Sequence, residues 1–254
     1  MKITTKNVIG GTILTPSEVR SIYLYGVKTT ASDGRSISDD TIQMYIESAQ
    51  REIEGYLDIK IIPQKVTETK SYRYDDVVKW GYLETSYPVR KALSVKGKIG
   101  NIQRIEYPKD WLVVREASDE TYFRVINIVP ASSPIVNTPT MLGVLPLTMY
   151  TNSHIPHYWD IQYHSGYQMV PMELVNFIGK LASINVFQNL GDLILGAGIS
   201  SQSIGIDGLS QSISTTKNGD NSAFGARIKS YQNDLKESLG RIKTRYRGIK
   251  FIAL

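Results

Sequence analysis

The sequence contains no cysteine, which excludes disulfides, thiolate metal sites and cysteine nucleophiles together. No run of about 18 apolar residues occurs, and the first residues lack the apolar core of a signal peptide. We therefore expect a protein that is made and used without export and without contact with a membrane. The patterns GxGxxG before a helix, GxxxxGK(S/T) and GxSxG are also missing. We expect no cofactor and no enzymatic activity.

Histidine is scarce, with three residues in the chain. His154, His157 and Asp160 stand three apart and form the one arrangement that resembles a set of metal ligands. Pro156 lies between the histidines, and the segment is typical of a loop that enters a strand, so a helix would not bring the three together. We interpret them as surface residues and expect no metal. A metal-dependent hydrolase remains the third hypothesis.

The composition is that of a globular protein. Of 254 residues, 41% are hydrophobic and 21% are charged, so the chain is long enough to bury a real core. The net charge of +5 makes polyanions plausible neighbours without requiring them. Sixteen tyrosines stand against five phenylalanines, a bias that favours interfaces, where a ring is buried at one end and wet at the other.

Residues 1–60 predict the N-terminal helical part of a core. A capping box at Thr15 to Glu18 starts a first helix, whose apolar side would hold Val19, Ile22 and Tyr23 and which Gly26 would end. Ser38 would cap a longer helix with one apolar face. The residues of that face are Ile42, Tyr45, Ile46, Ala49, Ile53, Tyr56 and Leu57.

Residues 61–170 predict an inserted β-rich module. The segments KVTETKSYRY, YPVRKALSVKG, WLVVREASDETYFRVINIVP and YWDIQYHSGY are rich in β-branched and aromatic residues and are separated by turn residues. Two of the strands, around Val113 and around Ile126, should pair as a hairpin. Several prolines between 130 and 146 indicate an irregular loop or an edge strand.

Residues 171–195 predict a central core helix. Its apolar residues cover most of the circumference, so other elements must cover it on several sides. Gly166 and Tyr167 form a turn between the last strand and this helix, and Pro171 suits its first position, which needs no amide donor. We call Gly166, Tyr167 and Pro171 the structural corner.

Residues 196–220 predict a Gly/Ser-rich extended arm or hairpin. A flexible linker would not need aliphatic residues, and this segment holds several. We expect them to order against a partner as a subunit-interface arm. They are Ile199, Ile204, Ile206, Leu209 and Ile213.

Residues 221–254 predict a basic C-terminal helix and tail. Apolar residues recur at steps of three and four from Phe224 to Tyr246, as in a seam between helices. Between Arg227 and Lys250 there are eight basic and two acidic residues. The basic side chains either solvate the outer face of the helix or contact a portal or the phosphates of DNA in a lumen. The candidates for contact are Arg227, Lys229, Arg241, Lys243, Arg245 and Arg247.

Together these parts predict an α+β fold, with a helical core made of N-terminal helices and two C-terminal helices and with an inserted antiparallel β module. Their order resembles the head-to-tail connector, or adaptor, proteins of tailed bacteriophages. The resemblance is carried by SDDTIQMYIESAQREIEGYL, YPVRKALSV and YWDIQYHSGYQMVPMELVNFIGKLA, and covers residues 15 to 190. The matching positions are Pro88, Val89, Tyr163, Gly166, Tyr167 and Pro171.

The resemblance implies a structural virion protein at the head-to-tail junction, assembled in the cytoplasm of the host bacterium. Such proteins form a ring, typically twelve-fold, between the portal of a DNA-filled head and the tail or stopper proteins. Genomic double-stranded DNA passes through the lumen without sequence recognition. The alternative hypothesis is a non-specific nucleic-acid-binding module that uses the basic C-terminal helix.

Overall fold

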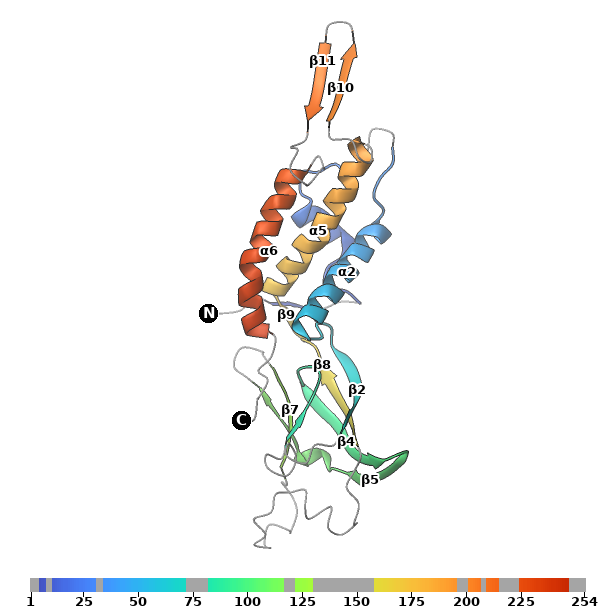
Figure 1. Cartoon of the computed structure of the whole chain (residues 1–254), viewed down its shortest axis with the longest axis vertical. Coiled ribbons are helices and arrows are strands. Elements are labelled where there is room, and N and C mark those ends of the chain that lie inside the picture. The colour runs from blue at the N-terminus through green and yellow to red at the C-terminus, as the bar shows by residue number, and fades with distance from the viewer. Residues whose placement is uncertain are drawn as a thin grey trace. The chain divides into compact units, whose positions relative to one another are not determined.

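The computed structural model of the chain describes residues 5–7, 11–30, 34–71, 82–116, 122–129, 158–195, 201–206, 209–214 and 224–246. The helices are α1 (Pro16–Glu18), the π-helix η1 (Val19–Tyr23), α2 (Asp39–Leu57), the 3-10 helix η2 (Lys109–Trp111), α5 (Met172–Leu195) and α6 (Gly225–Tyr246). The strands are β1 (Thr5–Asn7), β2 (Gln64–Ser71), β3 (Tyr82–Glu84), β4 (Lys91–Ile99), β5 (Ile102–Glu106), β6 (Leu112–Glu116), β7 (Tyr122–Ile128), β8 (Tyr158–Ser165), β9 (Met169–Pro171), β10 (Ser201–Ile206) and β11 (Leu209–Ser214). This mixture of helices and antiparallel sheets confirms the predicted α+β class (Figure 1).

The chain divides into two compact units. The helical unit consists of Met1–Tyr56 and Met169–Thr244, and the β unit consists of Leu57–Gln168 and Arg245–Leu254. The finer division into five parts, with limits at 60, 170, 195 and 220, stays a prediction.

The first helix of the helical unit begins at the predicted capping box. The Glu18 amide donates to Thr15 Oγ1 at 3.3 Å, and the Thr15 amide donates to Glu18 Oε2 at 2.9 Å. The helix then continues as η1, in which the Leu24 amide donates to the carbonyl of Val19 five residues back. This wider turn buries Val19 and Leu24 and leaves Ile22 58% exposed, so the prediction of Ile22 on the apolar side was wrong.

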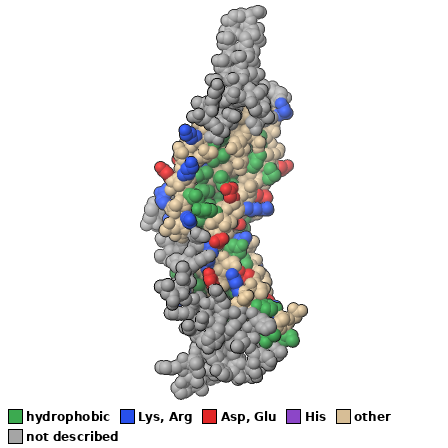
Figure 2. Space-filling view, in the orientation of Figure 1, with side chains coloured by type: hydrophobic (Ala, Val, Ile, Leu, Met, Phe, Trp, Pro, Cys, Tyr) green, Lys and Arg blue, Asp and Glu red, His purple; other side chains and the backbone are tan. Residues whose placement is uncertain are grey.

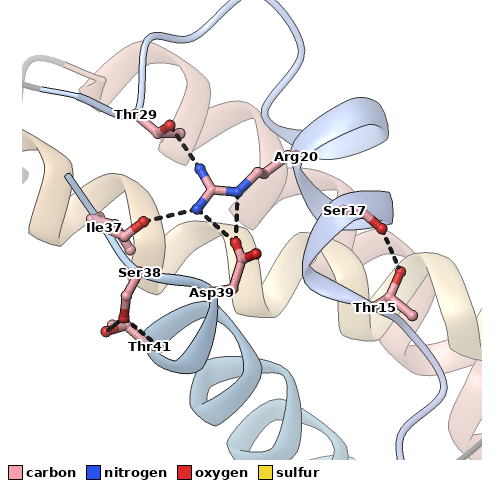
Figure 3. A network of polar contacts seen from close by, with 8 residues as sticks. All are labelled: Thr15, Ser17, Arg20, Thr29, Ile37, Ser38, Asp39 and Thr41. Carbon is pink, nitrogen blue, oxygen red and sulfur yellow. Dashed lines mark hydrogen bonds and ion pairs between the residues drawn. The ribbon is translucent and has the colours of Figure 1, made fainter.

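A network around Arg20 ties η1 to the start of α2 (Figure 3). Its guanidinium donates to Asp39 Oδ1 at 2.9 Å and 3.1 Å, to the Ile37 carbonyl at 2.8 Å and to Thr29 Oγ1 at 2.7 Å. These four contacts hold the loop between the two helices, because one guanidinium group reaches Thr29 within the loop and Ile37 and Asp39 at its end.

Helix α2 begins after its predicted cap, where Ser38 Oγ accepts from the Thr41 amide at 3.2 Å. Most of the predicted apolar face is buried, while Tyr45 is half-buried and Tyr56 is exposed. The buried members are Ile42, Ile46, Ala49, Ile53 and Leu57. The face therefore packs into the core, as its spacing predicts.

Helix α5 lies between α2 and α6 in the helical unit (Figure 1). It is buried around most of its circumference, through Leu174, Val175, Phe177, Ile178, Ala182, Ser183, Ile184, Val186, Phe187 and Leu190. At Gly179 a Cβ atom would lie 2.2 Å from Cζ of Tyr23, so only glycine allows this approach of η1. The Tyr23 hydroxyl donates to Asn176 Oδ1 at 2.9 Å, and burial raises the pKa of Tyr23 to about 12.

The β unit contains a four-stranded sheet of order β2-β8-β4-β5 and a three-stranded sheet of order β3-β7-β6. Both sheets contribute to one hydrophobic core, made of Leu83, Val89, Val95, Tyr107, Trp111, Ile126, Ile128, Trp159, Ile161 and Tyr163. Strand β8 buries alternate residues, as its sequence predicts. The predicted hairpin is also confirmed, since β6 pairs with β7 in antiparallel orientation.

Arg124 in β7 is 2% exposed, and the end of α2 supplies its partners. Its Nη2 atom donates to the carbonyls of Leu57 at 2.8 Å and Asp58 at 3.0 Å, and its Nη1 atom lies 3.6 Å from Asp58 Oδ2. The last carbonyls of a helix lack partners within it, so the buried guanidinium caps α2.

Candidate functional site

Helix α6 carries the predicted basic residues, and its apolar seam orients them. Of the seam residues, Ile228, Leu235, Ile242 and Tyr246 are buried and Phe224, Tyr231 and Leu239 are half-buried. The Phe187 ring of α5 lies 5.2 Å from that of Phe224 and 6.1 Å from that of Tyr231. This packing fixes the rotation of α6 and divides its charged residues into two flanks, one on each side of the seam.

The first flank holds Arg227, Asp234 and Arg241, at seven-residue spacing, and Arg245. Arg227 is held within the chain, because its Nη1 atom donates to the Tyr25 carbonyl at 3.0 Å and its guanidinium lies 5.5 Å from the centre of the Phe187 ring. Arg245 is half-buried, with its guanidinium 5.7 Å from the centre of the Tyr246 ring. These two arginines contribute to packing within the chain.

Arg241 lines a groove of about 320 Å³ between α5 and α6. The lining residues are Glu173, Asn176, Phe177, Lys180, Asp234, Glu237, Ser238, Arg241 and Ile242. Lys180 Nζ donates to Asp234 Oδ2 at 2.6 Å across it. With three acidic and two basic side chains, the groove has no excess of positive charge that would favour a phosphate.

The second flank is a lysine stripe, which we define as Lys229, Lys236 and Lys243. All three are exposed and stand seven residues apart on one side of α6. At 1.5 Å per residue the stripe extends about 21 Å along the helix. Lys243 Nζ also lies 5.8 Å from the centre of the Tyr56 ring. On the face seen in Figure 2, Lys and Arg side chains are spread among acidic and hydrophobic ones and do not gather in one patch.

The predicted contact residues therefore do not form a single surface. Lys229 and Lys243 lie on the lysine stripe, Arg241 faces the groove, and Arg227 and Arg245 pack against aromatic rings. Arg247 lies outside the described residues. Lys236, which the prediction did not include, lies on the same stripe, as its seven-residue spacing from Lys229 and to Lys243 indicates.

The structural corner joins β8 to α5 along the chain. Gly166 has φ +105, and a Cβ there would lie 2.3 Å from the Ile62 carbonyl oxygen, so a side chain would collide with backbone. The Tyr167 amide donates to the Ile61 carbonyl at 2.9 Å. Pro171 ends β9, opposite Thr5 of β1, and the helix begins one residue later than predicted, at Met172. A proline suits this place because neither a strand end nor a helix start needs its amide.

The aliphatic residues of the arm fall on an antiparallel hairpin, in which β10 pairs with β11. In its register Ile206 lies opposite Leu209, Ile204 opposite Gln211, and Ile213 opposite Gln202. Ile199 lies outside the described residues.

Of the residues in the metal hypothesis, only Asp160 is described. It lies in β8, and its Oδ2 atom accepts a hydrogen bond from Lys98 Nζ, which raises the pKa of Lys98 above its ordinary value. His154 and His157 lie outside the described residues. In the part of the chain that the structure describes, no three His, Asp or Glu side chains are grouped so as to hold a metal ion.

Among the described helices, none is both long and apolar enough to cross a membrane.

Comparison with known proteins finds similar solved chains, three of which follow. No protein-family model matches the chain, and no match was found among the curated proteins. A chain from the neck of an empty GTA particle, computed with C6 symmetry, is 16% identical over 72% of this chain and 82% of its own, with a TM-score of 0.43. A chain from the virion of a native gene transfer agent (GTA) particle is 17% identical over 72% and 82%, with a TM-score of 0.44. A third, from the neck of a native GTA particle computed with C12 symmetry, is 16% identical over 72% and 81%, with a TM-score of 0.42. Similarity of this degree transfers no role to this protein.

Proposed function

We propose that this protein is a structural virion protein that forms a ring at the neck of a tailed bacteriophage. The ring, with twelve-fold symmetry as in the connector family, joins the portal of the DNA-filled head to the tail or stopper proteins. The protein acts by assembly and catalyses no reaction. It is assembled in the cytoplasm of the host bacterium and remains in the virion.

The observation that carries this proposal is the order of elements along the chain. A capped helix α2 precedes the β unit, in which Pro88 and Val89 stand before strand β4, and the Gly166 turn then leads from β8 to the apolar helix α5. This is the order of the connector family that the sequence resembles. The corner residues are engaged in backbone packing and a backbone hydrogen bond, which is a mechanical role.

The lysine stripe supplies the contact with the portal or with DNA in the lumen. Its three ammonium groups are exposed on one side of α6, so they can lie near phosphates without any sequence recognition. The hairpin β10–β11 supplies contacts between subunits. The stripe lies apart from the buried seam that α6 uses within its own unit.

Immunogold labelling of intact phage particles tests the proposal. Antibody raised against the recombinant chain is applied to particles from the producing culture, and pre-immune serum serves as the control. We expect gold only at the head-to-tail junction. Particles that label with antibody to another virion protein but carry no gold from this one contradict the proposal.

The second candidate is a free nucleic-acid-binding module, which the exposed lysine stripe favours. Its test is binding of the isolated chain to a fluorescent DNA duplex, measured by anisotropy at several salt concentrations. Three phosphate contacts give a slope of log K against log salt of about −2.7. A slope of that size, together with no label on particles, selects this candidate over the connector.

A further inference from the structure

The hairpin β10–β11 is a two-stranded sheet, and neither of its outer edges pairs with another described strand. Six residue pairs join its strands without a register shift, from Ser201 opposite Ser214 to Ile206 opposite Leu209. Among the described strands, β10 and β11 pair only with each other. A sheet of two strands leaves a row of backbone amides and carbonyls free along each outer edge.

The sheets of the β unit protect their edges in ways that natural proteins commonly use. In the four-stranded sheet the edge strand β2 contains Lys65, Glu68 and Lys70, and the edge strand β5 adjoins a register shift in β4. In the three-stranded sheet β3 has only three residues, and β6 has a register shift before Glu116. Charges, bulges and short strands all discourage pairing with another chain.

The edges of the hairpin have none of these features. The sequences of β10 and β11, SQSIGI and LSQSIS, contain no charged residue and no proline. Their pairing is regular over its whole length. Edges of this kind can pair with a further strand.

The sequences of the two strands indicate a candidate for the further strand. The tetrapeptide Ser-Gln-Ser-Ile occurs in β10 at residues 201–204 and again in β11 at residues 210–213. Within the hairpin the two copies already form an antiparallel ladder, in which Ser203 lies opposite Ser212. The β11 edge of one molecule and the β10 edge of another bring the same two sequences together, so the same ladder can form between molecules.

We infer that the hairpin pairs edge to edge with hairpins of further copies of this chain, β11 of one against β10 of the next. The inference deepens the proposed function, on which it rests only for the closure of the ring. In the register of the hairpin, Ser203 of one copy lies opposite Ser212 of the next. Each copy binds one neighbour through its β10 edge and another through its β11 edge. This is a heterologous arrangement, which forms a ring when the rotation between copies closes.

Single cysteines test this pairing cleanly, because the chain has none of its own. Full-length Ser203→Cys and a longer, tagged Ser212→Cys are mixed at high concentration and treated with a short thiol-to-thiol crosslinker. Each molecule has one thiol, so every product links two molecules, and its size shows which two. Opposite residues of paired strands lie about 5 Å apart, within reach of the reagent.

The control replaces Ser212→Cys by Ser230→Cys, an exposed position on α6. We expect at least about tenfold more mixed product from the Ser203→Cys and Ser212→Cys pair, because strand pairing raises the local concentration of the thiols. Yields equal to those of the control overturn the inference. Crosslinking of either variant mainly with itself also overturns it, since like edges would then be paired.

A second pair of variants separates edge pairing from other association. Ser201→Lys and Ser210→Lys, added together to both cysteine variants, place charge on both edges and should reduce the mixed product to the control level. Ser201→Thr and Ser210→Thr, which favour strands and add no charge, should leave it unchanged. Circular dichroism checks that all variants keep their helices. An undiminished product with the lysines overturns the inference.

The outcome is distinguishable from that of the proposed function. Gold at the neck with no mixed product removes the hairpin pairing and leaves the connector in place. Mixed product without gold at the neck keeps the pairing between copies and removes the connector.

Discussion

Helices α5 and α6 have similar lengths, 24 and 22 residues, but differ in burial. Helix α5 is buried around most of its circumference, whereas α6 buries one seam and exposes a lysine stripe on its flank. A helix covered on most sides mainly supports the fold, and a helix covered on one side can also meet a partner. Changes in α5 should therefore affect stability, and changes on the flank of α6 should affect binding.

Phe187→Ala in α5 should have the largest effect. The ring is fully buried and packs against Phe224 and Tyr231 of α6. Its removal should lower the free energy of unfolding by about 3 to 5 kcal/mol, because a cavity remains where the ring was. Urea unfolding followed by circular dichroism measures this change. The control is Gln188→Ala, at the exposed neighbouring position, which should change the free energy of unfolding by less than about 0.5 kcal/mol. Equal losses in the two variants would contradict the difference between the buried and exposed sides of α5.

A pair of glycine substitutions should change stability in opposite directions. Gly179→Ala in α5 places a methyl group against the buried ring of Tyr23 and should lower the free energy of unfolding by about 2 kcal/mol. Gly240→Ala in α6 meets no atom within 4 Å and should raise it by up to about 1 kcal/mol, because alanine is the better helix former. Differential scanning calorimetry of both variants gives the sign. A higher free energy of unfolding for both variants would show that α5 tolerates the methyl group.

Tyr23→Phe should produce a smaller loss with a characteristic pH dependence. The variant loses the hydrogen bond to Asn176, which contributes about 1 kcal/mol. In the wild type the pKa of Tyr23 is raised from 10.0 to about 12, so the folded chain keeps a proton that the unfolded chain releases between these values. The contribution is therefore complete below pH 10 and is lost as the pH rises to about 12. The urea midpoints of the wild type and of Tyr23→Phe should converge as the pH rises from 10 to about 12. Midpoints that keep a constant difference over this range would show that the Tyr23 hydroxyl does not stabilise the fold in this way.

The sequence predicted the elements whose signals are local. The capping box at Thr15, the cap at Ser38 and the alternation of β8 all act within a few residues, and the structure confirms each of them. The antiparallel hairpin of β6 and β7 was also confirmed. These features are decided by backbone hydrogen bonds and side-chain periodicity, which a single segment carries.

Features that depend on distant residues were missed. Ile22 is exposed because η1 forms a wider turn than an α-helix does. Arg124 is buried because the end of α2, 66 residues away, supplies its acceptors. The candidate contact residues were chosen by charge alone, and packing of the seam then separated Arg227 from the lysine stripe. No local pattern contains this information.

Replacement of the lysine stripe should have the smallest effect on stability. Lys229→Gln, Lys236→Gln and Lys243→Gln together should change the free energy of unfolding by less than about 0.5 kcal/mol, because all three side chains are exposed. If the stripe contacts phosphates, the slope of log K against log salt for duplex DNA should become less negative by about 2.7. The same three positions changed to arginine should keep the slope, and Arg241→Gln, in the mixed-charge groove, should hardly alter it. A change of about 0.9 for Arg241→Gln, which is the share of one lysine, would show that the net charge of α6, and not the position of the stripe, attracts DNA.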